Sequence, residues 1–240
     1  MKVFFALISL NLLVSYCYAQ RNPKFELLEL AAKEVDAQHY QNAVNLLDDF
    51  MAKDTTDYFA YYLRGEAQWH ITGNSQVLDD FNHSLRLNPR YSDAYYNRAL
   101  WESANTPEIA LSDCNQAIKY NINSKNLPNL YSLRGSVRIK LLDWIGAKTD
   151  ILKCLELDKT YSTAWRDLGE VYLNNNQFEQ AISALDKSIS LYQEDAFAYF
   201  YRGQAKAKSN KTESACLDFE RARKLIETNQ FDETINKYCH

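Results

Sequence analysis

Apolar and small residues recur along this chain at intervals of three, four and seven residues, a spacing that places them on one face of an α-helix. A short phrase built around a small residue returns five times, at Tyr62–Glu66, Tyr96–Leu100, Ser132–Ser136, Arg166–Glu170 and Phe200–Gln204. The small residue stands at positions 65, 99, 135, 169 and 203, so the steps between phrases are 34, 36, 34 and 34 residues. This period predicts tandem helix-turn-helix units, each of which buries its apolar face only against its neighbours.

The fifth unit shows the pattern most completely. It carries apolar, aromatic and small residues at regular positions on two helices: Trp165, Leu168, Gly169, Tyr172, Phe178, Ala181, Leu185 and Ser188. This pattern resembles the tetratricopeptide repeat (TPR) family, whose first helix carries Trp, Leu, Gly and Tyr and whose second carries Ala and an aromatic residue. The resemblance implies an all-α fold, namely an α-solenoid of tandem antiparallel helix-turn-helix units.

The repeats divide the chain into segments. We expect a signal peptide at 1–19, a degenerate repeat at 20–57, repeats two and three at 58–127, repeats four to six at 128–229, and a capping helix at 230–240. The single step of 36 residues falls at an Asn-rich segment, 121–129, that ends in a proline-containing sequence. This segment predicts a longer loop and a slight break in the stacking.

An arginine and an aspartate recur together within the repeats. Four repeats carry Arg just before the small residue and Asp on the second helix: Arg64 with Asp80, Arg98 with Asp113, Arg134 with Asp150, and Arg202 with Asp218. The fifth repeat replaces both, with Leu168 and Ala184. Because the two charges are lost together, we predict an ion pair that joins the helices of each repeat. The alternative is a ladder of arginines that binds an anionic ligand.

Composition and charge narrow the class of protein. The chain of 240 residues is 46% hydrophobic and 24% charged, with six Gly and four Pro, which is typical of a globular, helix-rich protein. The formal net charge is -4, and Lys and Arg do not cluster in a run. The sequence therefore lacks the basic footprint of nucleic-acid binding.

The first residues have the pattern of a secretory signal. Lys2 precedes an apolar stretch at 3–14, and a cleavage site follows at Ala19. The apolar stretch is shorter than the roughly 20 residues that a membrane-spanning helix needs. We expect export, to a periplasm or as a secreted protein, with membrane contact limited to this segment; an anchor that stays uncleaved is the alternative. In composition and signal the chain resembles periplasmic TPR proteins of Gram-negative bacteria.

Catalytic and ligand-binding motifs are missing from the sequence. The four His do not have a metal-ligand spacing, and the sequence has neither a phosphate loop nor a nucleophile elbow. We therefore expect a protein that is not an enzyme and that needs no cofactor, metal or small-molecule substrate. Cys114 and Cys154 stand at repeat positions that predict a buried core residue. Cys216 and Cys239 either form a disulfide between the last repeat and the capping helix or remain separate thiols.

A partner is expected in the concave groove, which in the TPR family is lined by the first helix of each repeat. Carried onto this chain, the resemblance implies a groove with these residues: Phe59, Tyr62, Glu66, Trp69, Tyr96, Asn97, Arg166, Glu170, Phe197, Phe200 and Gln204. For each aromatic ring, packing against a neighbouring helix is an equal alternative. The family's carboxylate clamp for chaperone tails is not matched, because only Asn97 fits its pattern and Tyr62 and Glu66 do not.

The sequence thus predicts a non-catalytic scaffold that binds a protein or peptide. The alternative is a structural or assembly subunit of a cell-envelope complex that associates with itself. The oligomeric state stays open at this point.

Overall fold

The computed structural model describes residues 23–239 except 74, 122–123 and 227–228, and the signal peptide expected at 1–19 lies outside these residues. The described residues contain helices and no strand, which confirms the all-α prediction. They form two compact units, one up to Asn97 and the other from Arg98, and this division falls within a helix. No helix in the described ranges combines the length and the apolar character that crossing a bilayer requires.

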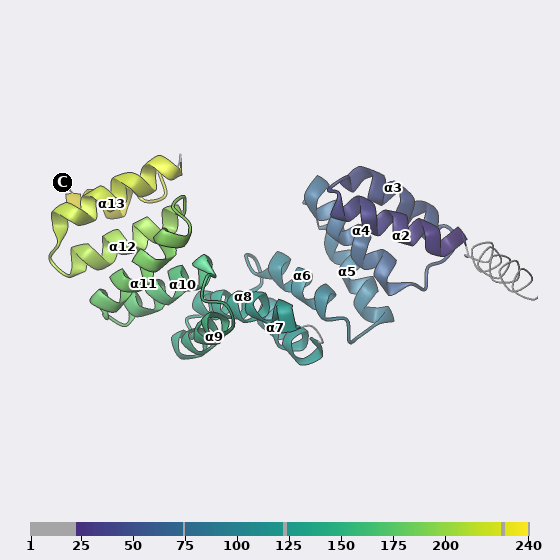
Figure 1. Ribbon diagram of the computed structural model, residues 1–240, viewed down its shortest axis with the longest axis horizontal. Coiled ribbons are helices and arrows are strands. Elements are labelled where there is room, and N and C mark those ends of the chain that lie inside the picture. Colours follow the sequence, from purple (N-terminus) through teal and green to yellow (C-terminus); the bar gives the residue numbers. More distant parts are fainter. Residues whose placement is uncertain (1–22, 74, 122–123, 227–228, 240) are drawn as a thin grey trace, which may run out of the picture. The chain divides into compact units, whose positions relative to one another are not determined.

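Consecutive helices pair as the repeats predict (Figure 1). The first unit contains α2 (Pro23–Asp36), α3 (Tyr40–Met51), α4 (Tyr58–Ile71), α5 (Gln76–Leu87) and the first half of α6 (Ser92–Glu102). The second unit continues from α6 through α7 (Pro107–Tyr120), α8 (Leu127–Lys140), α9 (Trp144–Leu157), α10 (Ser162–Asn174), α11 (Phe178–Leu191), α12 (Ala196–Lys208), α13 (Thr212–Leu225) and α14 (Asp232–Cys239). Within each unit every pair packs on the next, as in an α-solenoid.

The small residue of each phrase allows the two helices of a repeat to approach closely. A Cβ atom on Gly169 would lie 2.4 Å from Cγ of Leu185, and one on Gly203 would lie 2.7 Å from Cε1 of Phe219. Both distances are far below van der Waals contact. The glycine at this position is therefore a packing requirement, which the repeat pattern correctly indicates.

The predicted arginine–aspartate pairs are confirmed in all four repeats. In each, the arginine Nε and Nη2 atoms donate to the two carboxylate oxygens of one aspartate, with donor–acceptor distances between 2.6 and 2.9 Å. The aspartates are almost fully buried, as the 2% exposed side chain of Asp150 illustrates. In the fifth repeat, Leu168 and Ala184 replace the pair within one apolar cluster.

The same arginines also reach the preceding repeat, which the sequence pattern did not predict. Arg64 Nη1 donates to Asp48 Oδ1 of α3 at 2.7 Å, and Arg202 Nη1 donates to Asp186 Oδ1 of α11 at 2.6 Å. Arg134 Nη1 donates to the amide oxygen of Asn115 in α7 at 2.9 Å. One side chain thus joins three helices.

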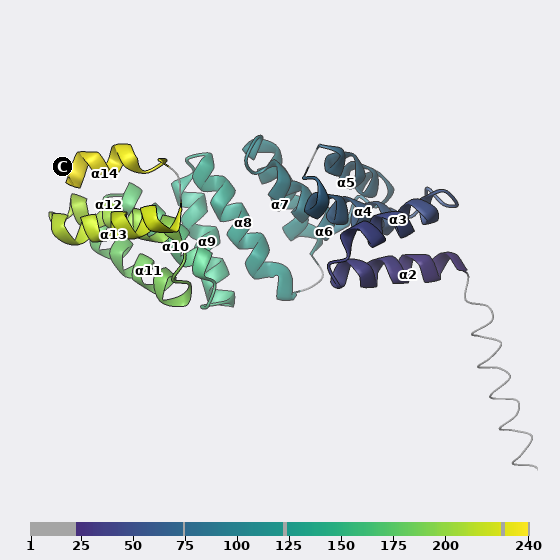
Figure 2. The ribbon, with the colours of Figure 1, turned by 90° about the horizontal axis from the view of Figure 1, so that it is seen from above.

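The C-terminal helix covers the last repeat. Helix α14 lies beside α13 (Figure 2), and its Ile235 is buried together with Phe231 just before it. A disulfide joins Cys216 of α13 to Cys239, which decides between the two alternatives that the sequence left open. Cys114 and Cys154 are free thiols in the core, and burial raises the pKa of each to about 12.

The long connection before α8 differs from the loop that the sequence predicts. Residues Ser124–Asn126 form a 3-10 turn, and α8 begins at Leu127 rather than after the proline. Pro128 lies in the first turn of α8, where a backbone N–H would have no acceptor within the helix. Proline, which lacks this N–H, is therefore tolerated there.

Candidate partner-binding surface on the first helices

A pocket of about 250 Å³ lies on the first helices of three successive repeats in the second unit. Helices α8, α10 and α12 are neighbours and supply its lining: Ser136, Ile139, Lys140, Arg166, Asp167, Glu170, Phe197 and Tyr201. Three of the residues expected in the groove, Arg166, Glu170 and Phe197, therefore meet in one place.

The charge of Arg166 is taken up by two aspartates. Its Nε and Nη2 atoms donate to Asp167 Oδ1 at 3.1 and 2.9 Å, and its Nη1 atom donates to Asp195 Oδ2 at 3.3 Å. The hydroxyl of Ser136 donates to the other oxygen of Asp167. This network fixes the guanidinium within the pocket wall.

Glu170 has weaker compensation for its charge. Burial raises the pKa of its carboxyl, and the negative charge of Asp167 raises it further. A hydrogen bond donated by the Tyr201 hydroxyl and the charge of Arg166 lower this pKa, but the net direction remains upward. The native site thus holds a half-buried carboxylate whose ionised form is disfavoured.

Aromatic rings lie on the α12 side of the pocket. The ring centroids of Phe197 and Tyr201 are 6.4 Å apart, and burial raises the pKa of the Tyr201 hydroxyl. On the α8 side, Lys140 is exposed, and its Nζ atom donates to the carbonyl oxygen of Ser103 at 2.8 Å. The pocket therefore combines an acid, fixed ion pairs and aromatic surface.

A second group of expected residues meets in the first unit, around Tyr62. Its ring stacks on Phe59 with centroids 5.9 Å apart and meets the edge of Tyr91 at 5.0 Å. The Asn97 side-chain amide donates to the Tyr62 hydroxyl oxygen at 3.4 Å. Burial raises the pKa of Tyr62, and the nearby Glu66 charge contributes in the same direction.

Glu66 repeats the electrostatics of Glu170. Both follow directly on the small residue of the phrase, at 65 and 169, and both are half-buried. Burial raises the pKa of Glu66 most, with further increases from Asp36 and Asp93, whereas the Tyr62 hydroxyl and His70 lower it. Each unit thus presents a half-buried glutamate hydrogen-bonded by a tyrosine hydroxyl.

The remaining expected residues do not line the pocket. Phe200 stacks on Phe231 with centroids 4.1 Å apart, and it also packs on Phe219, so its ring supports the C-terminal cap. Gln204, Trp69 and Tyr96 are half-buried on their helices.

Two lining residues that the repeat pattern did not indicate, Asp167 and Tyr201, make the polar contacts to Arg166 and Glu170. Each directly follows a residue that was expected to face the groove, Arg166 and Phe200. The signal that was available is helical geometry, because a step of about 100° leaves a neighbouring residue on the edge of the same face.

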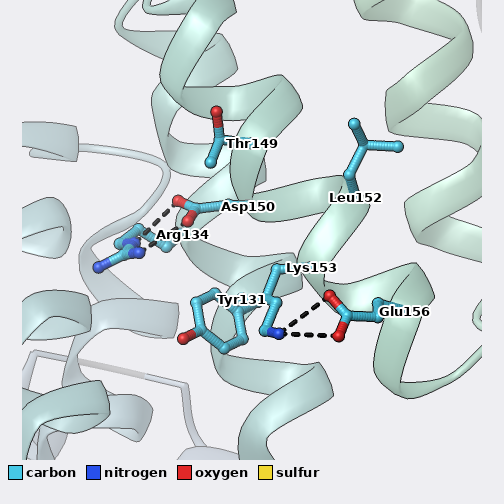
Figure 3. Close-up of a pocket in the computed structure, with 7 residues that line it drawn as sticks. All are labelled: Tyr131, Arg134, Thr149, Asp150, Leu152, Lys153 and Glu156. Atoms are coloured by element: carbon cyan, nitrogen blue, oxygen red, sulfur yellow. Dashed lines mark hydrogen bonds and ion pairs between the residues drawn. The ribbon is translucent and has the colours of Figure 1, made fainter.

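A different pocket, of about 550 Å³, lies between the two helices of the fourth repeat (Figure 3). Its walls carry the Arg134–Asp150 pair and an ion pair between Lys153 Nζ and Glu156 Oε2 at 2.9 Å. Because Arg134 is bound by Asp150 and Asn115, this pocket does not offer a free guanidinium to an anionic ligand. Clusters of His, Cys, Asp or Glu able to hold a metal are absent from the part of the chain that the structure describes.

Comparison with known sequences gives a family for part of the chain. The sequence model of the tetratricopeptide repeat matches residues 151–183, from α9 into α11. The human DnaJ homolog subfamily C member 7 is 25% identical over 162 residues, which is 62% of this chain and 33% of that protein. This chain thus spans about a third of the length of the curated relatives it matches.

Solved structures share the fold. PilW, a widely conserved type IV pilus biogenesis factor, matches with a TM-score of 0.71 and 15% identity, over 90% of this chain and 98% of PilW. YrrB, a TPR protein with an unusual peptide-binding site, matches with a TM-score of 0.61 and 16% identity, over 80% of this chain and 97% of YrrB. The family model thus identifies a tetratricopeptide repeat at residues 151–183, and the solved structures show the same fold over most of the chain. TPR proteins typically act as non-catalytic interaction modules, and no enzyme family is indicated.

Proposed function

We propose that this chain is a non-catalytic scaffold that binds an extended segment of a partner protein on the first helices of its repeats. The observation that carries this proposal is the convergence of α8, α10 and α12 on one pocket of about 250 Å³. That volume lies below the range of about 300–1,000 Å³ that is typical of small-molecule sites. It suits one or two side chains of a peptide whose backbone runs across successive helices.

We also infer that the protein works outside the cytoplasm. The signal pattern at 1–19 and the disulfide between Cys216 and Cys239 support this location, because structural disulfides persist mainly in oxidising compartments. The likeness to a pilus biogenesis factor is consistent with it. Mass spectrometry of the exported protein tests the inference, and we expect a mature chain that begins near Gln20.

A displayed library of random peptides tests the binding function. The full chain after the signal segment serves as bait, and selected peptides are measured by fluorescence polarisation against Phe197→Ala and, as a matched control, Leu152→Ala. Leu152 is 44% exposed and lines the other pocket, so its removal shortens an apolar side chain away from the proposed site. We expect Phe197→Ala to weaken binding and Leu152→Ala to leave it unchanged. Equal affinity of both variants for every selected peptide contradicts the proposal.

Self-association is a second candidate function, favoured by exposed apolar side chains at the turn between α8 and α9. Ile145 is 85% exposed and Leu142 is 69% exposed, close together at the turn between α8 and α9. Size-exclusion chromatography with light scattering separates the two candidates. A stable oligomer that dissociates when both residues become serine supports an assembly role, whereas a monomer over the accessible concentration range contradicts it.

A further inference from the structure

The pocket on α8, α10 and α12 has features that select among peptides. Its lining contains two cations and two carboxylates, but they are not equally available to a ligand. Arg166 is held by Asp167 and by Asp195, which lies just before α12, so its guanidinium and the Asp167 carboxylate neutralise each other.

Glu170 differs from these groups because it is bound only partly. It accepts a hydrogen bond from the neutral Tyr201 hydroxyl, and its carboxylate faces the like charge of Asp167. The ionised form of such a carboxylate is stabilised when a cation enters the pocket. The cation offsets both the loss of solvation and the repulsion from Asp167.

The rings beside Glu170 suit the same kind of ligand. Phe197 and Tyr201 lie 6.4 Å apart between centroids and are half-buried, so they present surface at the pocket. Aromatic faces attract ammonium and guanidinium groups, and they also cover the aliphatic stem of a lysine or arginine.

A related group of side chains occurs in the first unit, where the glutamate and the tyrosine lie on the same helix, α4. Glu66 occupies the matching repeat position and accepts a hydrogen bond from Tyr62, whose ring contacts those of Phe59 and Tyr91. Asp93 is a further acid in its surroundings. A second acidic position for a basic side chain of the partner is therefore expected at Glu66.

We propose that the pocket receives a lysine or arginine side chain of the partner, with its cation at the Glu170 carboxylate and its stem beside Phe197 and Tyr201. The partner is accordingly a basic extended peptide segment. This inference rests on the proposed peptide-binding function and adds the chemistry of its ligand.

The test uses peptides selected by the full chain, resynthesised with acetyl and amide ends and labelled for fluorescence polarisation. In each, every lysine or arginine is replaced singly by norleucine or citrulline, which remove the charge and keep most of the shape. We expect one such replacement to weaken binding to the native chain about tenfold or more, as for loss of a charged hydrogen bond.

A second experiment removes the charge from the protein instead of from the peptide. Glu170→Gln keeps an oxygen that accepts from Tyr201, and Glu156→Gln is the matched control because Glu156 is 68% exposed in the other pocket. We expect Glu170→Gln to bind the unmodified peptide about tenfold more weakly than the native chain does. The norleucine or citrulline peptide should bind Glu170→Gln and the native chain with nearly equal affinity. Glu156→Gln should bind every peptide as the native chain does. Circular dichroism confirms that each variant is folded.

The outcomes separate this inference from the function on which it rests. Peptides that depend on Phe197 but tolerate loss of every basic residue, or that bind Glu170→Gln as well as the native chain, overturn the inference and leave peptide binding in place. Selected peptides that are insensitive to Phe197→Ala overturn both.

Discussion

Replacement of Arg64 by leucine tests the arginine–aspartate pairs in quantitative terms. Arg64 donates from Nε and Nη2 to the two oxygens of Asp80, at 2.9 and 2.7 Å, and the Asp80 side chain is only 5% exposed. Leucine leaves this carboxylate buried without its guanidinium. Removal of one partner from a buried pair costs about 3–5 kcal/mol, and we expect about 3 kcal/mol because the Arg64 side chain is 25% exposed.

The double variant Arg64→Leu with Asp80→Ala reproduces the apolar pair that the fifth repeat uses, Leu168 and Ala184. We expect it to be more stable than the sum of the single losses predicts, by about 1 kcal/mol or more. The bond from Arg64 to the exposed Asp48 contributes at most about 1 kcal/mol to the single loss.

The assay is urea denaturation followed by circular dichroism, on the native chain, both single variants and the double variant. Arg134→Leu gives a matched comparison, because Asp150 keeps a second cation, Arg138 Nη1, at 2.8 Å. We expect Arg134→Leu to lose less stability than Arg64→Leu. Strictly additive losses in the free energy of unfolding for Arg64→Leu and Asp80→Ala, or a negligible loss from Arg64→Leu, would refute the buried ion pair.

Three further results are expected. Reduction of the disulfide between Cys216 and Cys239, 23 residues apart, should lower the stability of the second unit by about 3 kcal/mol, measured by melting with and without reductant; an unchanged melt contradicts this. Gly169→Ala should lower the free energy of unfolding, measured by urea denaturation, by about 1–3 kcal/mol because its Cβ would collide with Leu185. Adding Leu185→Cys to this variant should restore part of the loss. An unchanged stability of Gly169→Ala would contradict this prediction. Because the fold raises the pKa of Glu170, the native state binds this proton more tightly than the unfolded chain, so the contribution of Glu170 to stability increases as pH falls. Glu170→Gln should therefore raise the urea midpoint at pH 7 and lose this advantage near pH 4, and a lower midpoint at pH 7 would count against the assignment.

The repeat phrases predict the helices because the packing that they encode is local. A small residue at 169 opposite a large one at 185 specifies how two adjacent helices meet, and the same arrangement returns at Gly65, Gly135 and Gly203. The joint loss of both charges at Leu168 and Ala184 likewise identifies the ion pair elsewhere, because a buried charge without its partner is unfavourable.

The candidate site was predictable only in part. Position within the repeat identifies Arg166, Glu170 and Phe197, but it treats Phe200 in the same way, although this ring packs against Phe231 outside the repeats. The pattern also does not reveal that Arg166 turns to Asp167 and Asp195, because those contacts depend on side-chain conformation rather than on helical period. Tyr201 directly follows Phe200 on the same helix, so a wider definition of the groove face would have included it.

Hydrogen–deuterium exchange of the full chain, with and without a selected peptide, shows whether the partner binds to the first helices of the repeats. We expect peptide binding to slow exchange in α8, α10 and α12, and Phe197→Ala to remove this protection. Protection confined to the second helices α9, α11 and α13, with Phe197→Ala bound as tightly as the native chain, would contradict it.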